Sequence, residues 1–197
     1  LGYNGVDDIY DPSQGRTVNG WYEQVTGDDA FGILEGSYVQ YFTLHEDVLG
    51  RRTILAAKVL AGTIIGDAPP FEKYYAGGTS RYGIRGFEYR GVSTRGLQTN
   101  VTPGYAQYKD PIGSEWVFLT GAEITIPLVG QNFSLLLFTD SGTIDTGSYR
   151  LSVGTGLEIK VPQIFGNVPI RFEIASPLLR DDEDETQVFS FSGGGMF

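Results

Sequence analysis

Hydrophobic and polar side chains alternate along several stretches of the chain, most clearly from Arg150 to Val161. There, apolar residues occupy one parity and polar residues or glycine the other: Leu151, Val153, Leu157, Ile159 and Val161 against Arg150, Ser152, Gly154, Gly156, Glu158 and Lys160. The stretch from Ile170 to Ser176 repeats the pattern, with Ile170, Phe172 and Ile174 opposite Arg171, Glu173 and Ala175. Because successive side chains of a strand point to opposite faces, both stretches predict strands with one apolar face.

Extending the same analysis along the chain predicts six further strands, which brings the total to eight: Thr17–Val25, Ile33–Leu44, Thr53–Ile65, Trp116–Pro127, Phe133–Gly142 and Val188–Phe197. Pro162, Gly166 and Pro169 predict a turn that makes a hairpin of the two clearest strands. The predicted fold class is therefore all-β and antiparallel. Residues 1–16 are expected to form a turn on the periplasmic side that leads into the first strand, and residues 17–197 to hold the strands.

Alternation alone fits a soluble β-sandwich as well as a transmembrane β-barrel. The connections favour the barrel, because short turns at Leu128–Asn132, Pro162–Pro169 and His45–Arg52 contrast with longer loops at Gly66–Glu115 and Leu178–Gln187. Aromatic residues also gather near the predicted strand ends, as in interfacial girdles: Trp21, Tyr22, Tyr38, Tyr41, Phe42, Trp116, Phe118, Phe133, Phe172, Phe189, Phe191 and Phe197. We therefore predict an antiparallel transmembrane β-barrel.

Composition excludes several classes of function. The chain has 14 basic and 24 acidic residues and a net charge of −10, which argues against binding nucleic acid through phosphates. It has no cysteine, and its one histidine, His45, falls in a predicted short turn. The longest apolar stretch, Thr53–Ile65, carries Lys58 and is shorter than the roughly 20 residues of a membrane-spanning helix. We predict no enzymatic activity, no cofactor and no metal site.

Two groups of charged residues stand out. Arg81, Arg85, Arg90 and Arg95 lie in the long loop, where they could be solvated or bind lipopolysaccharide phosphates. The acidic run from Asp181 to Glu185 is dense enough to hold a divalent cation, but runs of like charge are usually solvated loops. The loop itself, Gly66–Glu115, is too long for an ordinary hairpin connection, which indicates a function.

A set of motifs resembles the BamA-like outer-membrane assembly superfamily. Pro70 to Thr79 (PFEKYYAGGT) followed by Ile84-Arg85-Gly86-Phe87 is similar to the sixth extracellular loop of that family, with its Val/Ile-Arg-Gly-Phe/Tyr tetrapeptide. Three further stretches resemble family motifs in the same order: Asp11–Arg16 (DPSQGR), Gly121–Leu128 (GAEITIPL) and Phe138–Gly142 (FTDSG). The end of the chain resembles the closing strand that marks barrel substrates, through Phe189, Phe191, Gly193 and Phe197.

The resemblance implies a specific role for the tetrapeptide. In the family the long loop folds into the barrel lumen, and the arginine of the tetrapeptide contacts acidic groups on the inner wall. Glu123 and Asp140 have the parity of inward-facing residues on neighbouring predicted strands, at heights that differ by about 10 Å. Arg85 would bind both, because its planar guanidinium can donate to two carboxylates. We call Ile84–Phe87 with these two partners the predicted latch.

The family barrel has sixteen strands, preceded by periplasmic polypeptide-transport-associated modules, so the eight predicted strands correspond to the C-terminal half. An eight-stranded barrel has no room for a loop of about fifty residues, although self-closure and the pairing of two copies stay open. The resemblance implies an outer-membrane protein assembly or insertion factor; a two-partner-secretion channel and the anchor of a patatin-like lipase are the alternatives. Expected partners are outer-membrane lipid and lipopolysaccharide, nascent outer-membrane proteins, the missing barrel half with its periplasmic modules, and periplasmic accessory lipoproteins.

Overall fold

The computed structural model describes residues 1–27, 30–97, 109–130, 132–144, 148–161 and 168–193. These residues form one large antiparallel sheet in the order β1-β2-β3-β4-β8-β9-β10-β11-β13. Its strands are β1 Gly2–Val6, β2 Gly15–Val25, β3 Phe31–Glu46, β4 Arg52–Gly66, β8 Trp116–Val129, β9 Phe133–Thr143, β10 Arg150–Ile159, β11 Ile170–Leu179 and β13 Phe189–Gly193. The sheet is an uninterrupted meander, apart from the long segment between β4 and β8.

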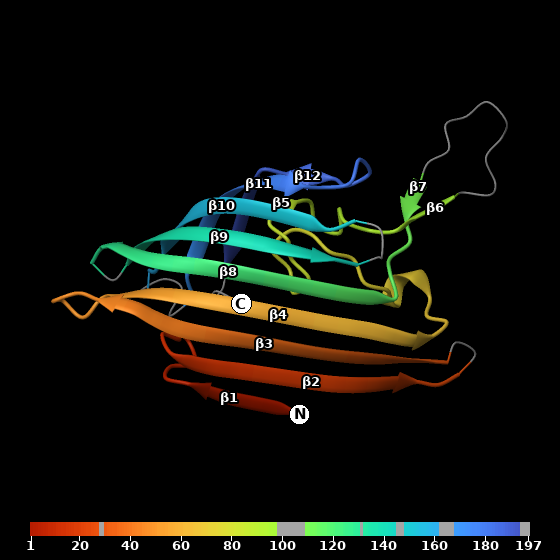
Figure 1. The fold of residues 1–197 in the computed structure, drawn as a ribbon, viewed down its shortest axis with the longest axis horizontal. Helices are drawn as coiled ribbons and strands as arrows, with labels where there is room; N and C mark the ends of the chain where they lie inside the picture. The colour runs from red at the N-terminus through yellow and green to blue at the C-terminus, as the bar shows by residue number, and fades with distance from the viewer. Residues whose placement is uncertain (28–29, 98–108, 131, 145–147, 162–167, 194–197) are drawn as a thin grey trace.

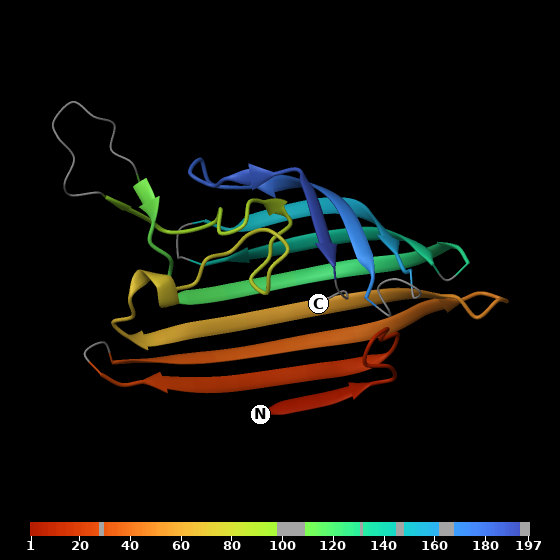
Figure 2. The same cartoon turned by 180° about the vertical axis from the view of Figure 1, so that it is seen from behind.

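The sheet curves around that segment (Figures 1 and 2). In both views β2, β3, β4 and β8 run nearly side by side, while β10, β11 and β13 turn away and enclose one face. We call the face against which residues 66–97 pack the inner face. Within the described ranges β1 has only β2 as a neighbour and β13 has only β11, so each presents a free edge.

The prediction of eight strands beginning at Thr17 is wrong by one strand. Gly2–Val6 forms β1 and pairs with β2 from Gly2 opposite Asn19 to Val6 opposite Gly15. The turn is consequently confined to the residues between Val6 and Gly15. The sequence from Leu1 to Val6 contains two glycines and an asparagine, so it lacks the alternation by which the other strands were predicted.

The other strands agree with the predicted ones to within a few residues at each end. His45 lies at the exposed end of β3, next to a bulge, instead of in the turn. The closing strand β13 begins at Phe189 and is described only to Gly193, so Phe197 falls outside the described residues. Within the described ranges, no helix has the length and hydrophobicity needed to cross a bilayer.

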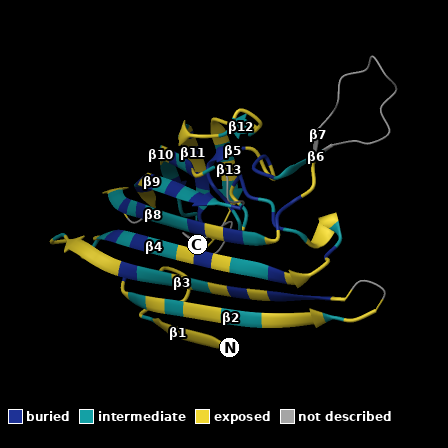
Figure 3. Cartoon of the chain, turned by 45° about the vertical axis from the view of Figure 1, so that its right-hand side comes forward, coloured by how far each residue is buried: buried dark blue, intermediate teal, exposed yellow. Residues whose placement is uncertain are grey.

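Burial follows the predicted parity (Figure 3). On β10 and β11 the inner face buries Ser152, Glu158, Arg171 and Glu173, while the outer face exposes Val153, Phe172 and Ile174. Similar apolar side chains cover the outer face of the remaining strands: Val18, Tyr22, Leu34, Tyr38, Val59, Phe118 and Leu137. An outer face of this kind suits the hydrocarbon of a membrane.

This face assignment predicts the effect of one matched pair of substitutions. Val59 lies on the outer face at the middle of β4, and Ser37 lies on the inner face of β3 at nearly the same height, since it pairs with Leu60. Val59→Arg should lower the free energy of unfolding in lipid by roughly 2–4 kcal/mol, and Ser37→Arg by much less. Urea titrations of both variants in liposomes measure the difference, and equal losses would contradict the assignment.

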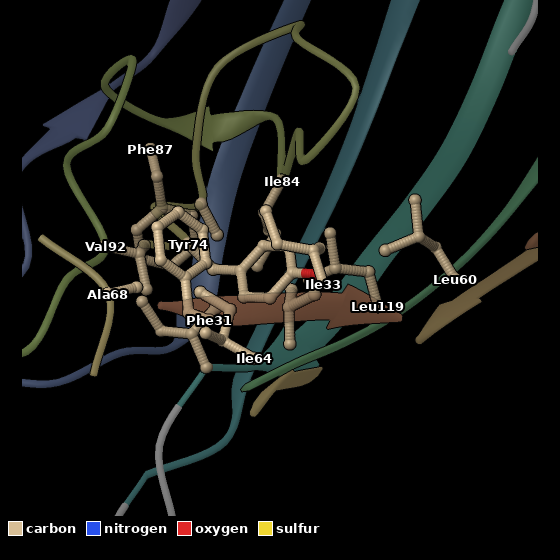
Figure 4. Close-up of a cluster of buried hydrophobic side chains, with 13 residues drawn as sticks. Phe31, Ile33, Leu60, Ile64, Ala68, Tyr74, Ile84, Phe87, Val92 and Leu119 are labelled. Carbon is tan, nitrogen blue, oxygen red and sulfur yellow. The ribbon is translucent and has the colours of Figure 1, made fainter. Parts of the chain in front are cut away.

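The inner face is not uniformly polar. The loop packs on an apolar cluster that draws on β3, β4 and β8 and includes Phe31, Ile33, Leu60, Ile64, Val117 and Leu119 (Figure 4). The loop contributes Ala68, Tyr74, Ala76, Ile84, Phe87 and Val92 to the same cluster. This explains why Thr53–Ile65 is almost continuously apolar, because its outer face carries exposed apolar side chains such as Val59 and the loop covers part of its inner face.

The turn between β1 and β2 is organised around Asp7. Partial burial raises the pKa of Asp7, but hydrogen bonds from the Ser13 hydroxyl and from the amides of Ser13 and Gln14 outweigh burial and lower it from 3.8 to about 2. Arg52 donates to the same Ser13 hydroxyl at 2.7 Å. A depressed folded-state pKa stabilises the protein above about pH 4, and this contribution is lost as pH falls through about 2.

Asp7→Asn should therefore reduce stability much more at pH 6 than at pH 2. Urea unfolding in detergent at both pH values measures the gap between variant and parent. Asp182→Asn, at an exposed position, serves as the control with no gap at either pH. A gap of the same size at both pH values would show that Asp7 does not titrate as described.

Candidate functional site

The long loop holds the tetrapeptide in a compact turn. It contains a short 3-10 helix, η1 Pro70–Glu72, and three short strands, β5 Gly86–Phe87, β6 Arg95–Leu97 and β7 Lys109–Pro111. The amide of Gly77 donates to the Tyr82 carbonyl at 3.1 Å, and the amide of Gly78 donates to the Phe87 carbonyl at 2.9 Å. Gly86 has a φ of 97°, a conformation that favours glycine, and faces Ser152 and Ala175 closely.

Arg85 is at the centre of this turn and is 6% exposed. Its backbone amide and its Nε donate to Oδ2 of Asp140 at 3.1 and 2.7 Å, and its Nη2 donates to Oδ1 at 3.0 Å. Its Nη1 donates to Glu123 and, at 2.8 Å, to Glu173. The guanidinium also lies 3.5 Å from the centroid of the Phe138 ring. The structure thus places Arg85 on both predicted partners and on a third carboxylate from β11.

A second buried arginine, Arg171 of β11, extends the network beyond Arg85. Nη2 of Arg171 donates to Glu123 at 2.9 Å and to Glu158 at 2.8 Å, and all three side chains are at most 5% exposed. Glu123 therefore lies between two guanidinium groups. Buried carboxylates need such partners, because removing one partner leaves an uncompensated charge in a low-dielectric site. The network joins the loop to β8, β9, β10 and β11.

Glu123 and Asp140 lie closer in height than predicted. Asp140 pairs with Gly121, two residues from Glu123, which corresponds to roughly 7 Å along the strand instead of 10 Å. A bulge between Pro127 and Val129 takes up the extra residue. Counting from the centre of the turn could not reveal the bulge, since it leaves no break in the alternation around Glu123.

The loop has a second anchor on the opposite side of the inner face. Glu35 of β3 is 2% exposed and accepts hydrogen bonds from Nε of Arg81 at 2.9 Å and from the Tyr82 hydroxyl at 2.7 Å. The indole Nε1 of Trp21 on β2 donates to the same carboxylate at 3.2 Å. Because Arg81 and Arg85 bind walls on different parts of the curved sheet, the loop spans the space between them.

The tetrapeptide combines this polar contact with apolar packing. Ile84 and Phe87 are at most 1% exposed and belong to the cluster that the loop forms with β3, β4 and β8 (Figure 4). Of the other loop arginines, Arg90 lies 3.7 Å above the Tyr75 ring, and Arg95 pairs with Glu185 at 3.4 Å. The structure therefore assigns three of the four arginines to contacts with carboxylates.

The acidic run also has partners. Nε and Nη2 of Arg150 donate to the two oxygens of Asp184 at 2.9 and 3.0 Å, and the Ser148 hydroxyl donates to Asp181 at 2.7 Å. Among the described residues, no group of three His, Asp or Glu side chains is arranged to hold a metal ion. Asp181 and Asp184 thus contact residues at the start of β10, while Asp182, Glu183 and Glu185 are exposed, as the composition predicts for a solvated loop.

The residues of the predicted closing-strand signal lie at the sheet edge. Phe189 and Phe191 are exposed on the outer face, where the Phe191 ring packs on Phe172 with centroids 5.2 Å apart. Gly193 pairs with Ile170 at the end of the β11–β13 ladder. The arrangement suits a lipid-facing edge strand.

Five charged residues that form ion pairs around the loop were not predicted as site residues from the sequence: Glu35, Glu158, Arg171, Glu173 and Asp184. Arg171 and Glu173 had been placed on the polar face of their strand, and the signal that could have found them is two consecutive inward-facing charges of opposite sign. Glu35 had no such signal, because its neighbours Ile33 and Ser37 share its parity but not its chemistry. The arrangement holds the described part of the loop against the inner face through ion pairs with buried carboxylates.

Comparison with known proteins agrees with this architecture. The Omp85 superfamily domain matches residues 1–197, the whole chain. The fold is similar to that of the crystal structure of BamA from Haemophilus ducreyi lacking POTRA domains 1–3, with a TM-score of 0.82 at 20% sequence identity. The superposition covers 98% of this chain and 41% of that one, so this chain spans about two fifths of the length of that BamA chain. No match is found among curated proteins.

Proposed function

Because this chain belongs to the Omp85 superfamily, an outer-membrane family of generally non-enzymatic transport and assembly proteins, we propose that it functions in assembling proteins into the bacterial outer membrane. In this proposal the nine strands are the C-terminal part of a larger, sixteen-stranded barrel. The remaining strands, with periplasmic transport-associated modules, would cover the free edges. Nascent outer-membrane proteins are the proposed substrates, with lipopolysaccharide and accessory lipoproteins as neighbours.

The observation that carries the proposal is the short closing strand beside a strongly held loop. Within the described residues β13 pairs with β11 over five positions, from Ile174 opposite Phe189 to Ile170 opposite Gly193, so Ala175–Leu179 of β11 lie beyond the ladder. Its other edge has no partner within the described ranges, so its backbone groups could pair with an incoming strand. By contrast, Arg85 holds the loop through three carboxylates. A weak seam beside a rigid lumen suits a barrel that opens laterally.

A secretion channel of the two-partner type is the second candidate. The same latch would then regulate passage through the pore instead of opening at the seam. The two functions differ in what they deliver: an insertase places folded barrels in the membrane, while a channel releases soluble protein across it.

One experiment separates them. The full-length protein is reconstituted into liposomes and supplied with a urea-denatured outer-membrane barrel plus a periplasmic chaperone. The proposal predicts that the heat-modifiable, protease-resistant fraction of substrate rises well above that of empty liposomes. A disulfide between β13 and the strand that pairs with its free edge should abolish the increase. If substrate folding stays at the level of empty liposomes and soluble protein is carried into the liposome interior, the protein is a secretion channel.

A further inference from the structure

The backbone of the tetrapeptide is hydrogen-bonded to the segment that leads into the closing strand. β12, Thr186–Gln187, forms a two-residue antiparallel ladder with β5, in which Thr186 pairs with Phe87 and Gln187 with Gly86. The ladder continues beyond β5, because the Glu88 amide donates to the Glu185 carbonyl at 2.9 Å and the Glu185 amide donates to the Gly91 carbonyl at 3.1 Å. The residues beside Arg85 are thus joined to β12 by main-chain bonds.

The same segment is anchored to the wall of the sheet. Arg150, at the first position of β10, makes a bidentate contact with Asp184, and both side chains are 2% exposed. A planar guanidinium that donates to both oxygens of one carboxylate fixes orientation as well as distance. On the loop side, Nη2 of Arg95 donates to the Glu183 carbonyl at 2.9 Å. Residues 183–187 are therefore held from two directions.

The closing strand follows this segment directly. Val188 separates Gln187 from Phe189, and its carbonyl accepts from the Ala175 amide of β11 at 2.9 Å. Beyond that bond β13 has only its short ladder with β11, and its other edge is free within the described ranges. The position of β13 must therefore depend on how firmly residues 183–187 are held.

We propose that residues 183–187 are a coupling segment that transmits the state of the latch to the closing strand. While Arg85 occupies its three carboxylates, β5 is fixed and aligns β12, which keeps β13 in register on β11. When Arg85 leaves, β5 moves, the β5–β12 ladder is lost, and β13 is held by its own ladder alone. The acidic run thus positions the seam instead of binding a cation. This inference deepens the proposed function, on which its biological meaning rests, but its test does not require any insertion or secretion activity.

Hydrogen exchange of the full-length protein in nanodiscs tests the coupling. Arg85→Ala should raise the exchange rates of the Phe189–Gly193 amides at least tenfold, although Arg85 does not touch β13. Asp184→Asn should have the same effect, because it breaks the anchor on Arg150. Asp182→Asn, in the same loop but at an exposed position, should leave these rates unchanged. Amides in the middle of β3 report global stability, so the rise in β13 exchange beyond any rise in β3 is the measure of the coupling.

A disulfide clip provides the converse test in this cysteine-free chain. Glu88 and Glu185 are exposed and lie across the extended ladder, at a separation that antiparallel neighbours and disulfides share. Oxidised Glu88→Cys/Glu185→Cys should slow exchange in β13, and in the Arg85→Ala background it should restore rates near those of the parent. If β13 exchange stays at the parental rate in both Arg85→Ala and Asp184→Asn, or if the clip changes nothing, the coupling does not exist.

Discussion

Replacing Arg85 with alanine is expected to release the long loop and to lower the free energy of unfolding by roughly 3–5 kcal/mol. The substitution removes the Arg85 contact of three carboxylates, Glu123, Asp140 and Glu173, each at most 2% exposed. Arg171 still pairs with Glu123, so the loss is expected to be greatest at Asp140, which accepts three hydrogen bonds from Arg85. Urea unfolding in detergent measures the stability, and protease cleavage within residues 66–97 measures loop release.

A double-mutant cycle isolates the contact from the general effect of mutation. Arg85→Ala combined with Asp140→Ala should cost less than the sum of the single variants, by roughly 1–3 kcal/mol, because the second change removes a carboxylate that the first had already left unpaired. Arg180→Ala, at an exposed position just after β11, is the matched control and should neither destabilise the protein nor couple to Asp140. Additivity within about 0.5 kcal/mol would mean that Arg85 and Asp140 do not interact in solution.

Alternation alone predicted most of the sheet, because a strand with lipid on one side and polar groups on the other must change polarity at each residue. The prediction was weakest where a strand lacks that contrast. β1 has two glycines within five residues, and its two faces do not differ enough to be recognised. At the start of β8 the inner face is also apolar, because the loop covers Val117 and Leu119. Both faces of the strand are apolar there, so the alternation does not show which face is the inner one.

Some residues of the site could likewise be predicted from the sequence, and others could not. Arg85, Glu123 and Asp140 could be predicted because a motif resemblance indicated one residue and parity indicated the other two. Glu173 and Arg171 share that parity, but sequence does not show which of several inward charges lie within reach of one guanidinium. The pairing of β5 with β12 could not be predicted from the sequence, because main-chain pairing between two-residue strands depends on backbone position and not on side-chain type.

The second large effect is expected at Gly77, where alanine should lower the free energy of unfolding by roughly 3–5 kcal/mol through backbone strain and the loss of two hydrogen bonds. Gly77 has a φ of 120°, which side chains rarely adopt. An added Cβ would also lie 2.1 Å from the Glu88 carbonyl oxygen, a backbone atom that cannot turn aside. The resulting shift must disturb the bonds from Gly77 to Tyr82 and from Gly78 to Phe87, which shape the turn around Arg85.

Gly50→Ala separates the two causes. Gly50 also has a positive φ, 74°, but an added Cβ would meet no atom within 4 Å. That variant should lose only about 1 kcal/mol, the cost of the left-handed conformation for alanine. If crowding at Gly77 is what disrupts the turn, Gly77→Ala should also expose the loop to protease as Arg85→Ala does, whereas Gly50→Ala should not. Equal stability losses at the two glycines, with the loop protected in both, would show that the turn tolerates the added methyl group and that the Arg85 contacts alone hold the loop.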